Sequence, residues 1–306
     1  MLATPPLVSI ITVNFNQTQM TCALLQSIRE QEFRDLEIIV VDNGSSNDPG
    51  ATIQARFPEV IFLRSTTNLG FAGGNNIGIG AARGQYLFFV NNDTEIPRHC
   101  IQQLADFLQA NPKCGAVSPL LYYFTPAPAL IQYAGMTPVS NVTARNSTVG
   151  ARTVDHGQFA QPTPTAYAHG AAMMVPARVV QEVGTMYPPF FLYYEELDWC
   201  ERIRAAGYEI WVQPLAQIYH KEGHTVGPNS PLKTYFIHRN RMLFMARNRR
   251  SALWLFYGYI WMVVFPKNLI IFILKKDWPN AKALSQAMLW YFGGIKNQYE
   301  RLAPVK

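Results

Sequence analysis

The chain has 306 residues, of which 49% are hydrophobic, so it is long enough for one large domain or for one domain with an added region. Its four cysteines, Cys22, Cys100, Cys114 and Cys200, show no C-x-x-C spacing, which argues against a zinc site and against a disulfide framework. The amino terminus has no basic stretch followed by an apolar run, and we therefore expect no secretory signal.

The net charge of +6 is unevenly distributed along the chain. Residues 1–232 carry 13 Lys and Arg against 18 Asp and Glu, whereas residues 233–306 carry 13 Lys and Arg against 2 acids. This asymmetry divides the chain into a domain over residues 1–232 and a basic region over residues 233–306. Such a basic region is typical of proteins that bind an anionic partner.

Apolar runs and helical spacings alternate along the first third of the chain. They predict strands over residues 7–15, 36–41, 60–63 and 85–90, and helices over residues 18–31, 49–57, 71–82 and 97–110. This alternation indicates an α/β fold with a doubly wound, mainly parallel sheet that is Rossmann-like in its nucleotide-binding half. Three of the four strands end in polar clusters, at the edge where such sheets bind nucleotides.

The middle of the chain has a weaker pattern. Residues 119–166 are rich in Pro, Thr, Ala and Asn, and we expect loops and short irregular strands there. Strands are predicted over residues 168–175 and 210–219, with a helix within residues 190–208. No Gly-x-Gly-x-x-Gly follows the first strand, which argues against a nicotinamide-dependent oxidoreductase.

Asn91, Asn92 and Asp93 directly follow the buried strand at residues 85–90. A carboxylate at that edge can hold Mg²⁺ or Mn²⁺ through oxygen, and the cation can bridge to a substrate diphosphate. The same residues also fit a simple turn before a helix that opens at Pro97. The pattern alone leaves both interpretations open.

A second acidic group lies where an aromatic run turns into a helix. Glu195, Glu196 and Asp198 favour a helix start through the macrodipole, and Asp198 is spaced for an ion pair with Arg202. A carboxylate next to apolar side chains also has a raised pKa and can act as a general base. His220 follows a further apolar strand and is expected to reach the same sheet edge.

The carboxyl-terminal region combines basic and apolar residues. Residues 252–265 carry no charge, residues 269–274 are wholly apolar, and Pro266-Lys267-Asn268 separates them. A membrane-spanning helix needs about 20 apolar residues, so this interruption favours a re-entrant or interfacial helix pair on an anionic membrane. A buried helical hairpin or a dimer interface is the alternative, and nucleic acid is a poor fit for so apolar a segment.

Taken in order, these motifs resemble the inverting family 2 glycosyltransferases with a GT-A fold, especially the bacterial rhamnosyltransferase-like branch. The resemblance covers about residues 7–250. It rests on residues 8–16, 41–46, 68–76, 91–94 and 190–198, and on His220.

The resemblance implies a donor-binding role for ten residues. Asp42 is expected to recognise the pyrimidine base, and Asn14 and Asn16 to line the nucleotide pocket. The remaining residues, which we expect near the diphosphate and the sugar, are Gly73, Gly74, Asn75, Asn76, Arg83, Asn91 and Asn92.

The resemblance also implies a metal site and a base. The family often has Asp-X-Asp where this chain has Asn91 to Asp93, which leaves Asp93 as the expected ligand of Mg²⁺ or Mn²⁺, completed by His220. The acceptor-activating base is usually the Asp of a Glu-Asp pair. Glu196 stands in that place here, followed in our order of preference by Glu195 and Asp198.

The activity implied is transfer of a sugar, with inversion, from a nucleotide-diphospho-sugar to a hydroxyl of a growing, lipid-linked cell-surface glycan. The donor expected first is dTDP-rhamnose and the second a UDP-sugar. Residues 1–232 would form the catalytic domain, and residues 233–306 would attach it to the inner face of the bacterial cell membrane. The alternative is a non-catalytic nucleotide-sugar or carbohydrate-binding protein of the same fold.

Overall fold

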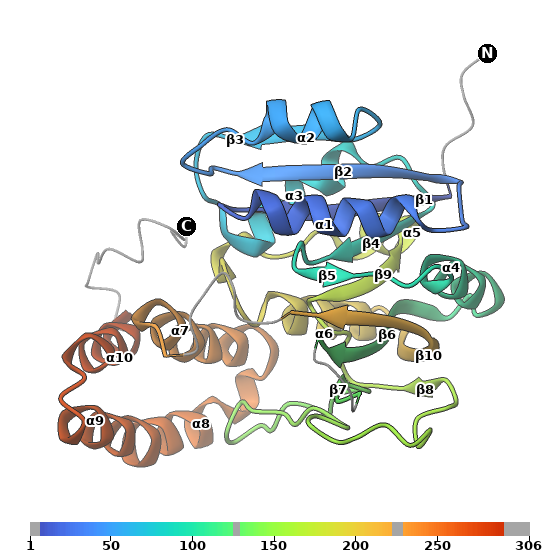
Figure 1. Cartoon of the computed structure of the whole chain (residues 1–306). Helices are drawn as coiled ribbons and strands as arrows, with labels where there is room; N and C mark the ends of the chain where they lie inside the picture. Colours follow the sequence, from blue (N-terminus) through green and yellow to red (C-terminus); the bar gives the residue numbers. More distant parts are fainter. Residues whose placement is uncertain (1–6, 125–128, 222–228, 291–306) are drawn as a thin grey trace.

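The computed structural model describes residues 7–124, 129–221 and 229–290 (Figure 1). The strands are β1 (Val8–Asn14), β2 (Leu36–Asn43), β3 (Ile61–Ser65), β4 (Tyr86–Val90), β5 (Thr94–Glu95), β6 (Cys114–Tyr123), β7 (Ile131–Tyr133), β8 (Thr163–Pro164), β9 (Ala172–Pro176) and β10 (Glu209–His220). The helices are α1 (Thr18–Arg29), α2 (Gly50–Arg56), α3 (Gly70–Ala81), α4 (Cys100–Ala110), α5 (Ala177–Val183), η1 (Pro188–Phe190), α6 (Glu195–Ala205), α7 (Pro231–Asn248), η2 (Arg250–Ala252), α8 (Leu253–Tyr259), η3 (Ile260–Val264), α9 (Phe265–Leu274) and α10 (Trp278–Trp290).

One sheet runs through the molecule in the order β3-β2-β1-β4-β9-β6-β10-β5, with β7 beside β6 and β8 beside β10. The strands β1 to β4 pair in parallel, as the alternating pattern predicts. Beyond β4 the pairing is mixed, because β9 is antiparallel to both β4 and β6. The predicted α/β class is therefore confirmed, but the mainly parallel pairing holds only for the first half of the sheet.

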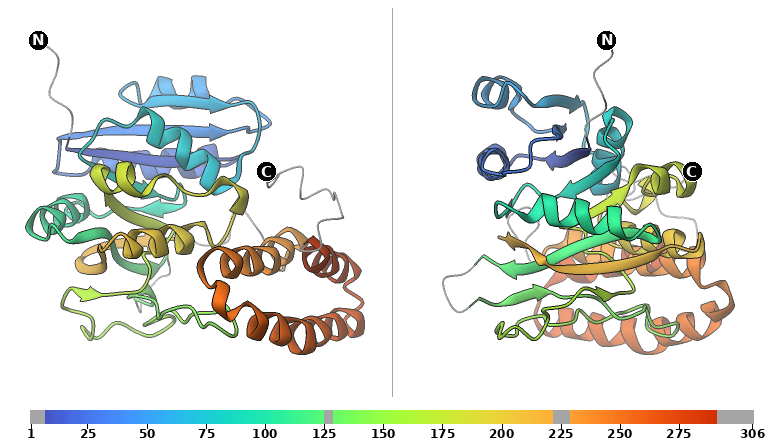
Figure 2. Two further views of the ribbon diagram at one scale, coloured as in Figure 1. Left: turned by 180° about the vertical axis from the view of Figure 1, so that it is seen from behind. Right: turned by 90° about the vertical axis from the view of Figure 1, so that its right-hand side faces the viewer.

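Helices cover both faces of the sheet (Figure 2). Neighbouring residues of one strand enter different cores: Ile38 faces a core with α1, α2 and α4, whereas Ile39 faces a core with α3, α5 and α6. Phe88 and Phe89 alternate in the same way. Burial on both faces explains why these strands are apolar throughout rather than at every second position.

The prediction of loops over residues 119–166 is wrong at its beginning, because residues 119–123 complete the long buried strand β6. Ser118 and Pro119 interrupt the apolar pattern of this strand, so the sequence does not indicate it. Ser118 is buried and donates to the carbonyl of Ala172, so its hydroxyl is satisfied inside the sheet. A register shift between Gln213 and Gln217 of β10 accommodates the irregular pairing.

The carboxyl-terminal helices form a group beside the sheet (Figure 1), and α10 packs back against α7. The expected break at Pro266 is wrong, because a single helix runs from Arg250 to Leu274. The five residues before α9 form a π-helical turn, and this wider turn gives room for a proline ring that lacks an N–H. Within the part of the chain that the structure describes, this is the one helix whose length and composition suit a membrane span.

Candidate active site

The polar residues at the ends of β1, β2 and β4 form one chain of buried hydrogen bonds. Asn92 donates from Nδ2 to Oγ1 of Thr21 at 3.0 Å, and that hydroxyl donates to Oδ1 of Asn14 at 2.8 Å. Asn14 in turn donates from Nδ2 to Oδ1 of Asp42 at 2.8 Å. Because each buried polar group has a partner, the three strand ends are held in one arrangement.

Asp42 lies at the inner end of this chain and is fully buried. Its carboxylate also accepts from Oγ of Ser45 at 2.5 Å and lies 3.3 Å from Nε of Arg64. The backbone N–H of Asn16 donates to the same Ser45 hydroxyl at 2.8 Å. Asn14, Asn16 and Asp42 are thus brought together at the predicted edge, while their contacts with a nucleotide stay predictions.

The predicted Gly-Gly-Asn-Asn segment lies inside α3. A Cβ on Gly74 would lie 2.9 Å from Cγ1 of Val13, so the glycine allows α3 to approach β1 closely. Asn75 donates to the carbonyl of Phe71, and Asn76 exchanges two hydrogen bonds with the backbone of Met186. These contacts are structural, and a role of Gly73 to Asn76 in donor binding stays a prediction.

The position predicted for Arg83 is wrong. Its guanidinium donates to Glu37 at 3.0 Å, and its backbone N–H donates to the same carboxylate. Glu37 also accepts from Ser9, and both residues lie near the beginning of their strands. Arg83 therefore lies at the amino-terminal edge of the sheet, opposite the strand ends where a donor diphosphate would bind.

Asp93 and His220 are adjacent because the short strand β5 pairs with the last residues of β10. In that pairing His220 is opposite Thr94, and the N–H of Lys221 donates to the carbonyl of Asp93 at 2.9 Å. As a result Nε2 of His220 lies 3.2 Å from Oδ1 of Asp93, and both side chains are largely buried. Asn91 and Asn92 lie directly before this pair, at the end of β4.

A second residue orients His220. Oε1 of Gln132, on β7, lies 2.9 Å from Nδ1 of His220 and holds the ring so that Nε2 faces Asp93. Ligands next to each other on an octahedral ion with bonds of about 2.1 Å are about 3 Å apart, which fits the separation of these two side chains. Within residues 7–124, 129–221 and 229–290 no three His, Cys, Asp or Glu side chains form a metal cluster. The pair therefore fits an ion that takes its other ligands from a substrate and water.

A strained turn precedes the acidic helix α6. Phe191, Tyr193 and Tyr194 all have positive φ, at 65°, 71° and 73°. Asn240 on α7 holds this turn, because its Nδ2 donates to the carbonyls of Phe190, Leu192 and Tyr193 at 2.7 to 2.9 Å. Such backbone strain persists only where the surroundings enforce it, and it is concentrated at functional sites.

Glu195 and Glu196 begin α6 directly after this turn. Burial raises the pKa of both carboxyl groups, and the charge of Glu196 raises the pKa of Glu195 further. One carboxylate oxygen of each has no hydrogen-bond partner within the described chain. Glu195 is buried, whereas Glu196 lines a pocket, so Glu196 is the acid that a ligand can reach.

The segment at residues 169–171 contacts Glu196 and residues beside the Asp93–His220 pair. A Cβ on Gly170 would lie 3.6 Å from Cγ of Glu196, so the backbone there contacts this acid. On the other side, the carbonyl of Ala171 accepts from the N–H of Asn91, and the His169 ring lies 6.3 Å from the His220 ring. Three consecutive residues thus contact both predicted groups.

Asp198 does not share this environment. It has no exposed surface, and its carboxylate accepts from Arg202 at 3.1 Å, from Arg247 at 2.9 Å and from Asn248 at 2.9 Å. A buried carboxylate whose oxygens already accept from three side chains is closed to a substrate hydroxyl, so Asp198 is not a suitable base. It instead joins α6 to the end of α7.

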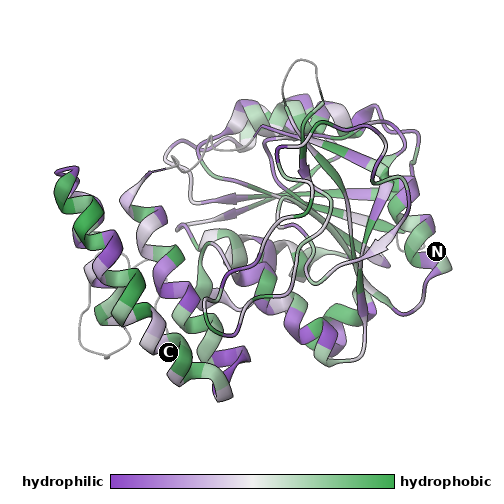
Figure 3. Ribbon diagram, turned by 90° about the horizontal axis from the view of Figure 1, so that it is seen from below, coloured by the Kyte–Doolittle hydropathy of each residue, from purple (hydrophilic) through white to green (hydrophobic). Residues whose placement is uncertain are grey.

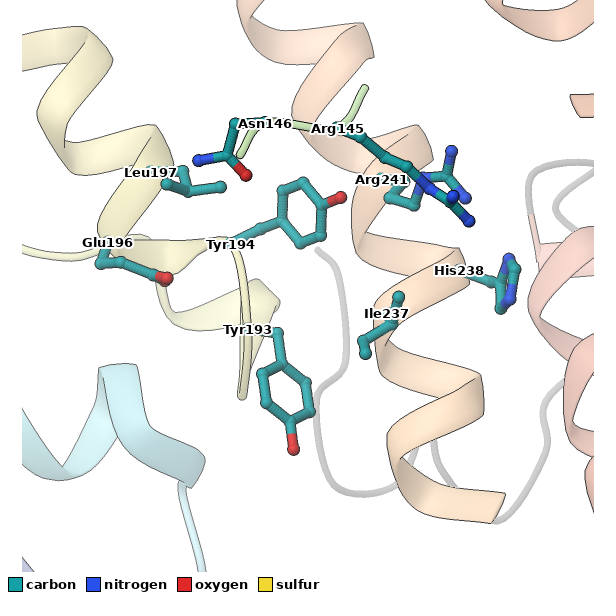
Figure 4. Close-up of a pocket in the computed structure, with 9 residues that line it drawn as sticks. All are labelled: Arg145, Asn146, Tyr193, Tyr194, Glu196, Leu197, Ile237, His238 and Arg241. Carbon is teal, nitrogen blue, oxygen red and sulfur yellow. The ribbon is translucent and has the colours of Figure 1, made fainter. Parts of the chain in front are cut away.

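The pocket at Glu196 has a volume of about 280 Å³ and lies between the acidic helix and α7 (Figure 4). It is lined by Arg145, Asn146, Tyr193, Tyr194, Glu196, Leu197, Ile237, His238 and Arg241. Aromatic and cationic side chains therefore line the pocket beside this acid.

This geometry can be compared with known proteins. The family model described as Glycosyl transferase family 2 matches residues 9–184, more than half of the chain. The chain belongs to this family. The family resemblance that the motifs predict, and its rhamnosyltransferase-like branch, are confirmed.

Two curated relatives are similar over most of the chain. A low-salt glycan biosynthesis hexosyltransferase of Haloferax volcanii is 26% identical over 216 residues, which are 68% of this chain and 66% of that protein. An N-acetylglucosaminyl-diphospho-decaprenol L-rhamnosyltransferase of Mycobacterium tuberculosis is 24% identical over 267 residues, or 80% and 85% of the two chains.

Solved structures support the fold. A mannosyltransferase of Pyrobaculum calidifontis, in complex with GDP-Man and Mn²⁺, superposes with a TM-score of 0.57 at 14% identity and covers 98% of this chain and 79% of that one. This similarity and the mixed sheet confirm the predicted GT-A fold of this family 2 glycosyltransferase.

Sequence reasoning missed several residues that shape the site. Thr21 joins Asn14 to Asn92 through hydrogen bonds, Gln132 holds His220, and neither lies in a recognisable motif. Asn240 and Arg241 lie in the basic stretch after residue 233, which the sequence treats only as charge. What marks these two residues as part of the site is their position on α7, the helix that packs against the strained turn. Only the folded structure reveals that position.

Replacing Asp198 by Asn should destabilise this glycosyltransferase. Removing one partner of a buried ion pair leaves the other charges uncompensated, and we expect a loss of about 3 kcal/mol in urea unfolding. Asp106→Asn is the control, because Asp106 is exposed and bonds only to Gln102 among the described residues. An Asp198→Asn protein of normal stability without activity would contradict the structural role.

Proposed function

We propose that this family 2 glycosyltransferase transfers a sugar, with inversion, from a nucleotide-diphospho-sugar to a hydroxyl group of a lipid-linked glycan. The observation that carries the proposal is the segment at residues 169–171, where Gly170 contacts Glu196 while Ala171 and His169 contact Asn91 and His220. A displacement with inversion needs a base and a site for the leaving group on opposite sides of the sugar. Glu196 suits the role of the base, and the Asp93–His220 pair suits the site of the leaving group.

The donor would bind at the ends of β1, β2 and β4. Asn14, Asn16 and Asp42 are candidates for the nucleotide: Asn16 is exposed at the strand ends, and the buried Asn14 and Asp42 belong to the preformed network beside it, which loses little conformational freedom on binding. We take dTDP-rhamnose as the first donor to test and a UDP-sugar as the second. The L-rhamnosyltransferase among the relatives supports this order.

Asp93 and His220 would hold a divalent cation, with Gln132 fixing the imidazole. When bound, Mg²⁺ or Mn²⁺ supplies Lewis acidity that offsets the negative charge of a leaving diphosphate. The protein contributes the orientation of the two ligands through the pairing of β5 with β10. The mannosyltransferase solved with GDP-Man and Mn²⁺ supports a metal at such a site.

Glu196 would take the proton of the acceptor hydroxyl. As the acceptor oxygen bonds to the anomeric carbon, the bond from that carbon to the diphosphate oxygen breaks, and the nucleoside diphosphate leaves with the electron pair. General base assistance of this kind contributes about 10²- to 10⁴-fold to the rate. The raised pKa of Glu196 makes its carboxylate a stronger proton acceptor than an exposed one.

The helix Arg250–Leu274 would bring the enzyme to a membrane-bound acceptor. One of its faces, with Phe256, Ile260 and Val264, is buried in the protein core. The other face exposes 72% of Trp254 and 80% of Met262, and hydrophobic residues recur along this helical group (Figure 3). A helix with one face docked on protein fits a position in the membrane interface better than a span.

Donor and metal can be tested together. With a panel of sugar nucleotides, we expect transfer or donor hydrolysis with one of them in the presence of Mn²⁺, and loss of this turnover on chelation. Asp93→Asn should lower turnover at least about 100-fold, because it removes a cation ligand. Asp106→Asn should behave like the wild type. Tight donor binding without any turnover would instead indicate a binding protein.

The pH dependence of turnover tests the base. A protonated carboxyl cannot accept a proton, so kcat/KM should rise with pH through the pKa of Glu196, at a midpoint above the usual value of about 4.3 for glutamate. Glu196→Gln should lose about 10²- to 10⁴-fold in turnover and lose this acidic limb as well. If Glu195→Gln removed the limb and Glu196→Gln kept it, the assignment would be reversed.

Membrane attachment can be tested without deleting the helix, whose buried face is part of the core. The double variant Met262→Glu, Ile270→Glu places two charges on the exposed face and should abolish flotation with anionic phospholipid vesicles. Leu215→Glu is the control, since Leu215 is also apolar and exposed but lies on β10. Unchanged flotation of the double variant would exclude this face as the membrane contact.

A further inference from the structure

The pocket at Glu196 has two chemically different ends (Figure 4). Glu196 lies at one end, and Arg145, His238 and Arg241 lie together at the other, with the ring of Tyr194 between them. Among the described residues that line this pocket, Glu196 is the only acid. The cationic end therefore has no carboxylate of its own.

Arg241 is buried, and its guanidinium is incompletely hydrogen-bonded. Only 1% of its surface is exposed, its Nη2 donates to the carbonyl of Thr143, and its Nε has no partner in the described chain. Two other arginines near the end of α7 differ in this respect, since Arg247 pairs with Asp198 and Arg249 pairs with Glu201. A buried guanidinium without a counter-charge is costly, and a bound anion would offset that cost.

The neighbours of Arg241 also favour a bound anion. Arg145 is close enough to oppose its charge, and together with burial it lowers the pKa of Arg241. Burial and the same two guanidinium groups lower the pKa of His238 to about 3, so this imidazole is neutral. Its buried Nδ1 has no partner within residues 229–290 or the rest of the described chain. Two cations and an unpaired imidazole nitrogen thus share one small space.

The apolar helix Arg250–Leu274 reaches the same place. Tyr259 on α8 is close enough to raise the pKa of Arg241, and Ile260 packs in the same core as Met242 and Phe244 of α7. From one end to the other, the site therefore offers the carboxylate of Glu196, the cationic side chains and then the membrane-facing helix. A lipid-linked saccharide has the same order of groups, with a sugar hydroxyl, a phosphate or diphosphate and a hydrocarbon chain.

We propose that Arg145 and Arg241, with His238, bind the diphosphate of the acceptor lipid while the acceptor sugar extends to Glu196. This assignment rests on the proposed function, because it names the acceptor-binding part of that same site. The two guanidinium groups suit this role, because their paired N–H groups donate charge-assisted hydrogen bonds to phosphate oxygens.

The test uses the full chain and two acceptors that carry N-acetylglucosamine, one as the farnesyl diphosphate ester and one as the neutral octyl glycoside. Arg145→Gln is the main variant, because Arg145 is exposed and its removal should leave the fold intact. We expect its KM for the diphosphate acceptor to rise at least about 10-fold, since a charged hydrogen bond is lost. Its KM for the neutral acceptor and for the sugar nucleotide should not change.

Arg241→Gln should show the same selective loss if it folds, and Arg34→Gln is the control at the opposite edge of the sheet. Arg34 is exposed, and its side chain bonds only to the carbonyl of Arg29 among the described residues. Equal losses with both acceptors, or a raised KM for the donor, would overturn the assignment.

Direct binding of farnesyl diphosphate, measured by calorimetry, separates the subsite from the reaction. We expect Arg145→Gln to weaken this binding at least about 10-fold, and Arg34→Gln to leave it unchanged. Binding that is equal in wild type and Arg145→Gln would overturn the subsite. Selective binding without sugar transfer from any donor would instead refute the proposed function and leave the subsite standing.

Discussion

The antiparallel pairing of two residues of β5 with the end of β10 is the constraint on which the rest of the site depends. It joins the residues after β4, in the parallel half of the sheet, to β10, the last strand along the described chain. This contact places His220 beside Asp93, and Gln132 then fixes the imidazole. Without it, a carboxylate and a histidine that are 127 positions apart in numbering would have no reason to meet.

The carboxyl-terminal helices are part of this architecture rather than a loosely attached region. Asn240 holds the strained turn before Glu196, and Arg247 and Asn248 bind the buried carboxylate of Asp198. The same helix, α7, packs against α10 and leads into the apolar helix Arg250–Leu274. A membrane contact on that helix would therefore be coupled through packed side chains to the position of the candidate base.

The sequence predicts the first half of the fold well, because strands buried on both faces give continuous apolar runs and helices give a clear period. It also places Asp42, Asp93 and Glu196 at the ends of elements. The Arg83 prediction failed because a motif shows only neighbours in sequence. Glu37, which binds Arg83 at the opposite edge of the sheet, becomes its neighbour only in the folded chain. Pro266 shows another limit, since a local π-helical turn absorbs a residue that ordinarily ends a helix.

The proposed reaction requires Glu196 and the Asp93–His220 pair to act on one sugar from two sides. A crystal structure with Mn²⁺ and a non-transferable analogue of the preferred sugar nucleotide tests it most directly, because the anomalous signal locates the ion. We expect the ion on Asp93 and His220, with the anomeric carbon of the sugar facing Glu196. An ion bound elsewhere, or a sugar separated from Glu196 by the segment at residues 169–171, would contradict it.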